Sequence, residues 1–127
     1  MRRAALILTV IWFIVGGIAH FVATGAFAGI VPSYVPLPRI VVYVSGALEL
    51  LGAMGMCLPK WRRSAAWCLI LLTILVTPAN VGMLLHAAQY PHIPVWALIA
   101  RLPLQVLLLL IIALAGGLIG RGEPPMR

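Results

Sequence analysis

The sequence predicts an all-α protein, a bundle of four transmembrane helices with both termini in the cytoplasm. Of its 127 residues, 64% are hydrophobic and only 9% are charged, whereas a soluble domain averages about 45–50% apolar and about 25% charged residues. Four apolar stretches each reach the roughly 20 residues that a helix needs to cross a bilayer. The basic residues lie between these stretches and mostly on one side. A chain of this length is expected to form one membrane domain, residues 1–127.

The four predicted helices correspond to the apolar stretches, which cover residues 4–24, 40–58, 65–88 and 95–120. Helices are expected because backbone polar groups in lipid must be satisfied within the spanning segment. Runs this long and continuously apolar do not match the alternating strands of a membrane barrel. Pro78 and Pro103 lie inside the third and fourth stretches. Each removes a backbone N–H, so both helices are expected to kink there.

The connections between the helices set the predicted orientation. Residues 25–39 carry three prolines and are expected to form an irregular loop, residues 59–64 are short and basic, and residues 89–94 are short. Seven of the nine Lys and Arg side chains fall on one side of the membrane: Arg2, Arg3, Lys60, Arg62, Arg63, Arg121 and Arg127. Because short basic loops stay in the cytoplasm, both termini and the 59–64 loop are predicted to face inward.

Charge and cysteine usage exclude several classes of partner. The net charge of +7 does not indicate nucleic-acid binding, because the basic residues are separated by apolar runs and suit contacts with the lipid bilayer. Cys57 and Cys68 are not a Cys-x-x-Cys motif, and two cysteines make neither a disulfide framework nor a zinc site. His20 and His86 have no metal-ligand spacing with a third residue. The sequence therefore predicts no metal site.

Polar residues inside the apolar stretches are the candidate ligand-binding residues. They are His20, Glu49, Asn80, Arg101 and Gln105. Counted from the predicted outer helix ends at 1.5 Å per residue, Glu49 lies about 13 Å deep and Arg101 about 9 Å deep. Each helix thus places a polar group in the outer half, while the inner half carries no ionisable side chain except the cysteines. The sequence predicts one polar cluster in the outer half.

Glu49 and Arg101 are predicted to form an ion pair within this cluster. They are the only acidic and the only strongly basic residue inside the spans, and each costs about 2.5–3.5 kcal/mol near the bilayer centre on insertion scales. Gly46 and Gly52 share the helix face of Glu49, so the carboxylate is expected to point at a neighbouring helix. Such a network can be purely structural and fix helix register, or it can also meet a ligand.

Five segments of the chain resemble the DoxX family of small four-helix membrane proteins. In order, they are "GIAHF" (17–21), "IVPSYVPLP" (30–38), "VSGALELLGA" (44–53), "TPANVGM" (77–83) and "RLPLQ" (101–105). The resemblance implies a four-helix bundle with both ends inside, in the inner (plasma) membrane of a bacterium. DoxX relatives include a small subunit of a thiosulfate:quinone oxidoreductase, proteins of membrane redox or thiol-stress systems, and distant receptor-assembly chaperones. The resemblance implies no catalytic residues.

Three functions are compatible with these features. In a quinone-linked or redox-accessory subunit, His20, Asn80 or Arg101 would donate hydrogen bonds to the quinone carbonyls, and Glu49 would exchange protons. The chain has no catalytic motif of its own, so it would at most accompany a redox partner protein. In a non-catalytic scaffold or assembly chaperone, the cluster is structural and helix faces or the 25–39 loop bind the partner. A small proton-coupled transporter would use Glu49 and require a homo-oligomer.

Overall fold

The computed structural model describes residues 1–120, and every regular element within this range is a helix. The long helices are α1 (Arg2–Val22), α3 (Pro38–Cys57), α4 (Arg62–Leu75) and α6 (Val95–Ala115), and the short ones are α2 (Thr24–Ala28), α5 (Thr77–Leu85) and the 3₁₀ turn η1 (Ala87–Gln89). Four segments are long and apolar enough to cross a membrane: α1, α3, α4 with α5, and α6. The predicted all-α fold with four candidate spans is confirmed. Arg121 and Arg127, used above for orientation, lie outside the described residues.

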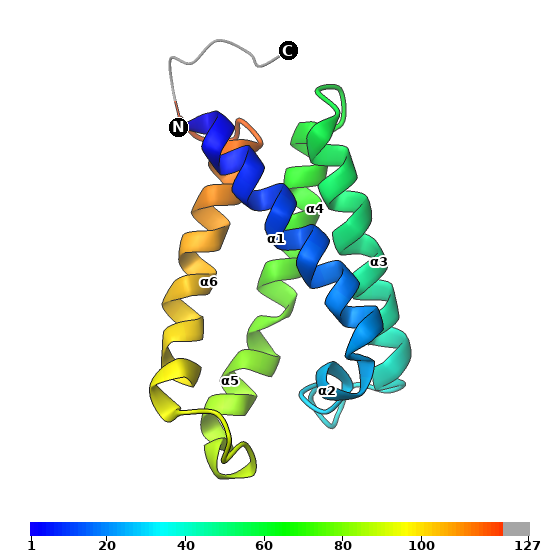
Figure 1. Ribbon diagram of the computed structural model, residues 1–127, viewed down its shortest axis with the longest axis vertical. Coiled ribbons are helices and arrows are strands. Elements are labelled where there is room, and N and C mark those ends of the chain that lie inside the picture. The colour runs from blue at the N-terminus through cyan, green and yellow to red at the C-terminus, as the bar shows by residue number, and fades with distance from the viewer. Residues whose placement is uncertain (121–127) are drawn as a thin grey trace.

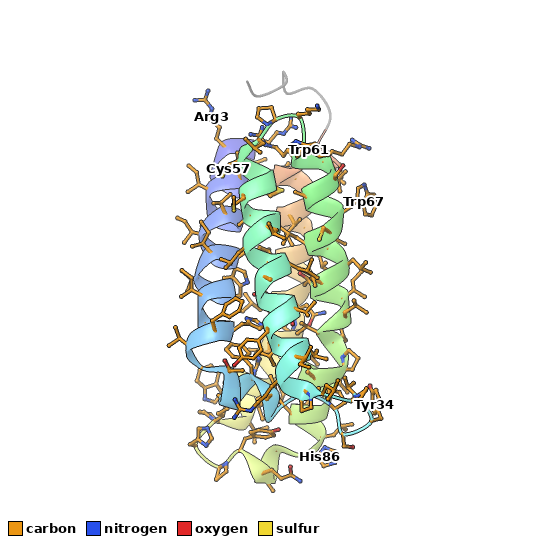
Figure 2. The ribbon with its side chains drawn as sticks, turned by 90° about the vertical axis from the view of Figure 1, so that its right-hand side faces the viewer. Arg3, Tyr34, Cys57, Trp61, Trp67 and His86 are labelled. Atoms are coloured by element: carbon orange, nitrogen blue, oxygen red, sulfur yellow. The ribbon has the colours of Figure 1, made fainter. Side chains whose placement is uncertain are left out.

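The helices form a bundle in which α1 packs against α3 and α6, and α4 also packs against α3 and α6 (Figure 1). Helices α3 and α6 are therefore diagonal to one another. The N-terminus, the α3–α4 connection and the C-terminal end of α6 lie at one end, which we call the basic end. The connections from α1 to α3 and from α5 to α6 lie at the other end, the loop end. Figure 2 shows Arg3 and Trp61 at the basic end and Tyr34 and His86 at the loop end.

The third span differs from the single helix predicted over residues 65–88. It is divided at Val76 into α4 and α5, and it ends at Leu85 before a 3₁₀ turn. Pro78 lies in the first turn of α5, where the missing proline N–H costs no helical hydrogen bond. Pro103, by contrast, lies inside α6, which continues through it as one helix. The proline in the third span therefore ends one helix and begins another.

The predicted irregular loop and the predicted end of the fourth helix are also corrected. The segment after α1 begins with the short helix α2, and turns follow it up to α3. Helix α6 ends at Ala115, five residues before the predicted end. Gly117 follows with a φ of +71°, a left-handed conformation that glycine adopts without strain and that commonly terminates helices.

The apolar core lies in the half of the bundle nearer the basic end. Its fully buried members include Ala53 and Met56 of α3, Leu69 of α4 and Ile112 of α6. Glycine permits close packing here, since a Cβ on Gly52 would collide with the Leu69 side chain. The outward faces are rich in exposed Leu, Ile, Val and Trp, which suits surrounding lipid tails. His20 and Asn80 lie toward the loop end of their spans, whereas Glu49 and Gln105 lie near the middle of α3 and α6.

Candidate functional site

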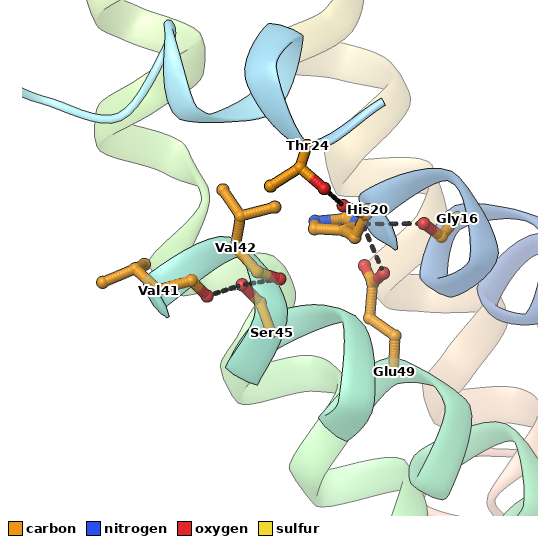
Figure 3. Close-up of polar contacts among 7 residues, drawn as sticks. All are labelled: Gly16, His20, Thr24, Val41, Val42, Ser45 and Glu49. Atoms are coloured by element: carbon orange, nitrogen blue, oxygen red, sulfur yellow. Dashed lines mark hydrogen bonds and ion pairs between the residues drawn. The ribbon is translucent and has the colours of Figure 1, made fainter. Parts of the chain in front are cut away.

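Glu49 of α3 pairs with His20 of α1. His20 Nδ1 lies 3.1 Å from Glu49 Oε2, and the two side chains are only 12% and 14% exposed. Nδ1 also lies 2.7 Å from the carbonyl oxygen of Gly16 (Figure 3). A carbonyl oxygen only accepts hydrogen bonds, so Nδ1 carries the proton and donates it to Gly16. The carboxylate lies beside this hydrogen bond rather than in line with it.

The His20–Glu49 pair forms where glycines bring α1 and α3 into close contact. A Cβ on Gly17 would come within 3.0 Å of the Gly46 carbonyl oxygen, and a Cβ on Gly46 would come 2.7 Å from the Cβ of His20. A Cβ on Gly16 would lie 3.5 Å from Glu49 Oε2. Small residues let membrane helices approach closely. The prediction that Glu49 points at a neighbouring helix across small residues is confirmed, with α1 as that helix.

Helix α2 covers the His20–Glu49 pair at the loop end. The Phe27 ring stacks on the His20 ring with centroids 4.2 Å apart. Thr24 Oγ1 donates hydrogen bonds to the carbonyl oxygens of His20 and Phe21, at 2.8 and 3.1 Å. These bonds attach the start of α2 to the end of α1. The imidazole is therefore fixed by a hydrogen bond to the Gly16 carbonyl and by stacking of the Phe27 ring on its face.

Asn80 and Gln105 form a second polar group, between α5 and α6. Asn80 Nδ2 donates to Gln105 Oε1 at 2.8 Å, and Gln105 Nε2 donates to Thr77 Oγ1. Asn80 is only 6% exposed. This chain of amide and hydroxyl groups links the two helices that meet at the loop end. Thr77 was not among the predicted site residues, although its position one turn before Asn80 was a usable signal.

Arg101 does not contact Glu49, the partner that the sequence predicts for it. Its Nη1 lies 3.0 Å from the Met83 sulfur, and the one ion pair among residues 1–120 joins Glu49 to His20. The predicted Glu49–Arg101 pair is therefore wrong, and the five predicted residues form separate groups rather than one cluster. His20 and Glu49 are together, Asn80 and Gln105 are together, and Arg101 lies beside Met83.

Two features of the bundle separate Glu49 from Arg101. Their helices, α3 and α6, are diagonal rather than adjacent. Glu49 and Arg101 also lie at different depths in the bundle. The sequence placed them at similar depths because each depth was counted from a predicted helix end. The glycine contacts between α3 and α4 and between α4 and α6 set the register of these helices. Counted from them, Glu49 is about two and a half helical turns further from the loop end than Arg101.

Two acceptor atoms of the predicted site residues are buried without a hydrogen-bond donor among the described residues. They are Glu49 Oε2 and Asn80 Oδ1. Buried acceptors of this kind are uncommon and call for water, an ion or a ligand as partner. Among residues 1–120 no group of three His, Cys, Asp or Glu side chains is placed to hold a metal ion. The available chemistry is that of hydrogen bonding and proton exchange at an imidazole and a carboxylate.

A shallow apolar cleft of about 120 Å³ lies between α1 and α6. Its walls are Leu8, Trp12, Leu104, Leu107, Leu108 and Ile111. The cleft does not contain the polar residues, but α1 carries both Trp12 and His20, and α6 carries both Leu104 and Gln105. It therefore lies along the same two helices as the polar groups, on the side nearer the basic end.

Comparison with known proteins identifies a family but no function. A family model described as "Domain of unknown function (DUF8561)" matches residues 8–115, a range that contains all five predicted site residues. No curated protein and no solved structure matches the chain. The resemblance to the DoxX family stays a prediction.

Proposed function

The chain belongs to the DUF8561 family, and we propose from its own residues that it binds a quinone or quinol in the membrane as an accessory subunit of a redox system. The observation that carries the proposal is the His20–Glu49 pair, an imidazole and a carboxylate inside two candidate spans. Ionisable residues within spans are costly and are functional candidates by default. Neither residue belongs to the apolar core cluster.

The hydrogen-bonding capacity of the pair suits a quinone head group. The contacts of the imidazole with Gly16 and Glu49 both use Nδ1, which leaves Nε2 for a ligand. Protonated Nε2 donates to a quinone carbonyl, and a quinol hydroxyl donates to an unprotonated Nε2 or to the carboxylate. Glu49 Oε2 is closed off from the surface, so the head group would reach the pair through Nε2. Displacement of Phe27 from its stacked position would open that path.

The cleft between α1 and α6 suits the tail of such a molecule. Its lining is aliphatic apart from Trp12, as a polyisoprenoid tail requires. Trp12 precedes His20 by eight residues on α1, which is about 12 Å along the helix axis. A head group near His20 can therefore place its tail in the cleft. The same cleft would otherwise hold an acyl chain of the bilayer.

A non-catalytic scaffold is the second candidate, and the α5–α6 contact favours it. Thr77, Asn80 and Gln105 bond mainly to one another, as residues that only fix helix packing would. In that case the protein would act as an assembly partner of other membrane subunits. The two candidates differ in whether His20 and Glu49 have an external ligand.

The charge distribution supports an orientation with the basic end in the cytoplasm. Within residues 1–120, the basic end carries Arg2, Arg3, Lys60, Arg62 and Arg63, whereas the loop end carries Arg39 in the first turn of α3. Because Lys and Arg are retained on the cytoplasmic side, the proposed quinone site would face the outer leaflet of a bacterial inner membrane. A redox partner protein would then meet the bundle within the membrane or at its outer surface.

Quinone binding to the purified protein in lipid nanodiscs tests the proposal. Short-tailed benzoquinone and naphthoquinone analogues are titrated against the wild type, His20→Gln, Glu49→Gln and the control Thr73→Val. The Thr73 hydroxyl is buried but bonds only to the Leu69 carbonyl of its own helix, so its loss should leave affinity unchanged. Weaker binding in both polar variants is expected. Absence of binding by the folded wild type, or equal binding by all four proteins, contradicts the proposal and leaves the scaffold candidate.

A further inference from the structure

We propose that the basic end binds the phosphate group of an anionic phospholipid through Arg2, Arg62 and Arg63. These side chains come from α1 and α4 and lie around the C-terminal end of α6. The site is separate from the polar residues near the loop end. It does not depend on the proposed quinone function.

Arg2 and Arg63 both reach Gly117, the residue that follows the end of α6. The Arg2 guanidinium packs on Gly117 so closely that a Cβ there would collide with Nη2. Arg63 Nη1 donates to the Gly117 carbonyl oxygen at 3.4 Å. Gly117 has a φ of +71°, so a side chain is disfavoured here by conformation as well as by space. Two guanidinium groups are thereby brought to one residue.

Arg62 of α4 adds a third guanidinium. Arg62 as a whole residue is only 8% exposed, and its Nε donates to the Met56 carbonyl oxygen at 2.7 Å. One helical turn after Arg62, Ala66 meets Gly116 at the end of α6. Arg62 is thus on the face of α4 that points toward α6 and the bundle interior. Only Nε makes the bond to Met56, so the Nη1 and Nη2 groups of Arg62 are left to bind a phosphate oxygen.

The charges at this end are not balanced within the described chain. Arginine stays protonated in proteins, and the C-terminal end of α6 offers only about half a negative charge. The one carboxylate side chain within residues 1–120 is Glu49, which is paired with His20. Moreover, Arg2 Nε is buried without a hydrogen-bond acceptor among these residues. An unpaired, desolvated guanidinium donor indicates a missing anion.

A phospholipid headgroup matches the position and the donors of the site. Guanidinium groups bind phosphate oxygens in a bidentate manner, and headgroups occupy the level at which membrane helices end. Trp61, 54% exposed in the connection before α4, is suited to that same interfacial level. The acyl chains of the bound lipid would lie on the exposed apolar faces below. Phosphatidylglycerol, with one phosphodiester and a net negative charge, is a suitable probe.

Lipid binding by the purified full-length protein in a neutral detergent tests this site. Native mass spectrometry measures the affinity for phosphatidylglycerol and for phosphatidylcholine with the same acyl chains. We expect a preference for phosphatidylglycerol that falls about tenfold in Arg2→Gln and in Arg63→Gln, as for loss of one charge-assisted hydrogen bond. Arg39→Gln removes the same charge near the loop end and should keep the preference. Arg62 is left unchanged because its Nε also bonds to the α3 backbone.

Two further measurements complete the test. Inorganic phosphate at millimolar concentration should not displace the lipid, and displacement would show a site for free anions and overturn the lipid assignment. Glu123→Gln should leave the preference unchanged, whereas a stronger preference would show that the chain's own carboxylate occupies the site. Equal loss in Arg2→Gln and Arg39→Gln, or no preference in the wild type, overturns the site itself.

Discussion

Gly46 of α3 faces His20 of α1 so closely that a Cβ on the glycine would come 2.7 Å from the histidine Cβ. This contact brings the Glu49 carboxylate of α3 within 3.1 Å of the imidazole. The His20–Glu49 pair therefore depends on a backbone approach that only glycine allows. The consequences can be measured one residue at a time.

Gly46→Ala should destabilise the protein by about 1–3 kcal/mol, because overpacking forces neighbouring groups to shift. The added methyl group would push α1 away from α3 and separate His20 from Glu49. Gly82→Ala is the matched control, since a Cβ on this helical glycine would meet no heavy atom within 4 Å apart from its chain neighbours and the backbone of its own helix. The control should be neutral or stabilising by up to about 1 kcal/mol. Thermal unfolding in detergent micelles measures both, and equal effects would contradict the close contact.

His20 and Glu49 should be energetically coupled, whereas Glu49 and Arg101 should not. Residues in contact show coupling energies of about 0.5–3 kcal/mol, and distant residues add within about 0.5 kcal/mol. A double-mutant cycle of His20→Leu with Glu49→Leu is therefore expected to deviate from additivity. The cycle of Arg101→Leu with Glu49→Leu should be additive. The reverse pattern would restore the Glu49–Arg101 pair and contradict the bundle geometry.

Asn80→Leu should weaken the contact between α5 and α6. The substitution leaves Gln105 Oε1 without the donor that lies 2.8 Å away. Side-chain hydrogen bonds between membrane helices contribute about 0.6 kcal/mol on average and up to about 1.7, so a loss within this range is expected. Thr73→Val should cost less, because the Thr73 hydroxyl bonds within its own helix. Hydrogen exchange that stays unchanged in α5 and α6 of the Asn80 variant would argue against a linking role.

The loop end should be accessible from outside the cell and the basic end should not. Tyr34 is 76% exposed, and Lys60 is exposed in the α3–α4 connection. After replacement of Cys57 and Cys68, Tyr34→Cys should react with an impermeant thiol reagent on intact cells. Lys60→Cys should react only after the membrane is opened. Labelling of position 60 alone on intact cells would invert the proposed orientation.

The helices were predictable because each apolar run has the length of a span and must satisfy its own backbone. The partner of Glu49 was not predictable. The depth of each polar residue was counted from a predicted helix end, and the order of the helices around the bundle was unknown. A difference in depth of about two and a half turns decided between His20 and Arg101 as its partner. Phe27 was also missed, since a loop rich in small and apolar residues gave no signal that α2 would cover His20.

Photoaffinity labelling with an azidoquinone tests the central claim, that the His20–Glu49 pair is a quinone head-group site. The probe is activated on the wild-type protein in nanodiscs, and the modified peptides are identified by mass spectrometry. The predicted adducts lie between His20 and Phe27 and on α3 near Glu49, and they are lost in Glu49→Gln but kept in Thr73→Val. Labelling confined to α5 and α6 around Asn80 and Arg101, or spread equally over all four spans in both variants, would contradict the claim.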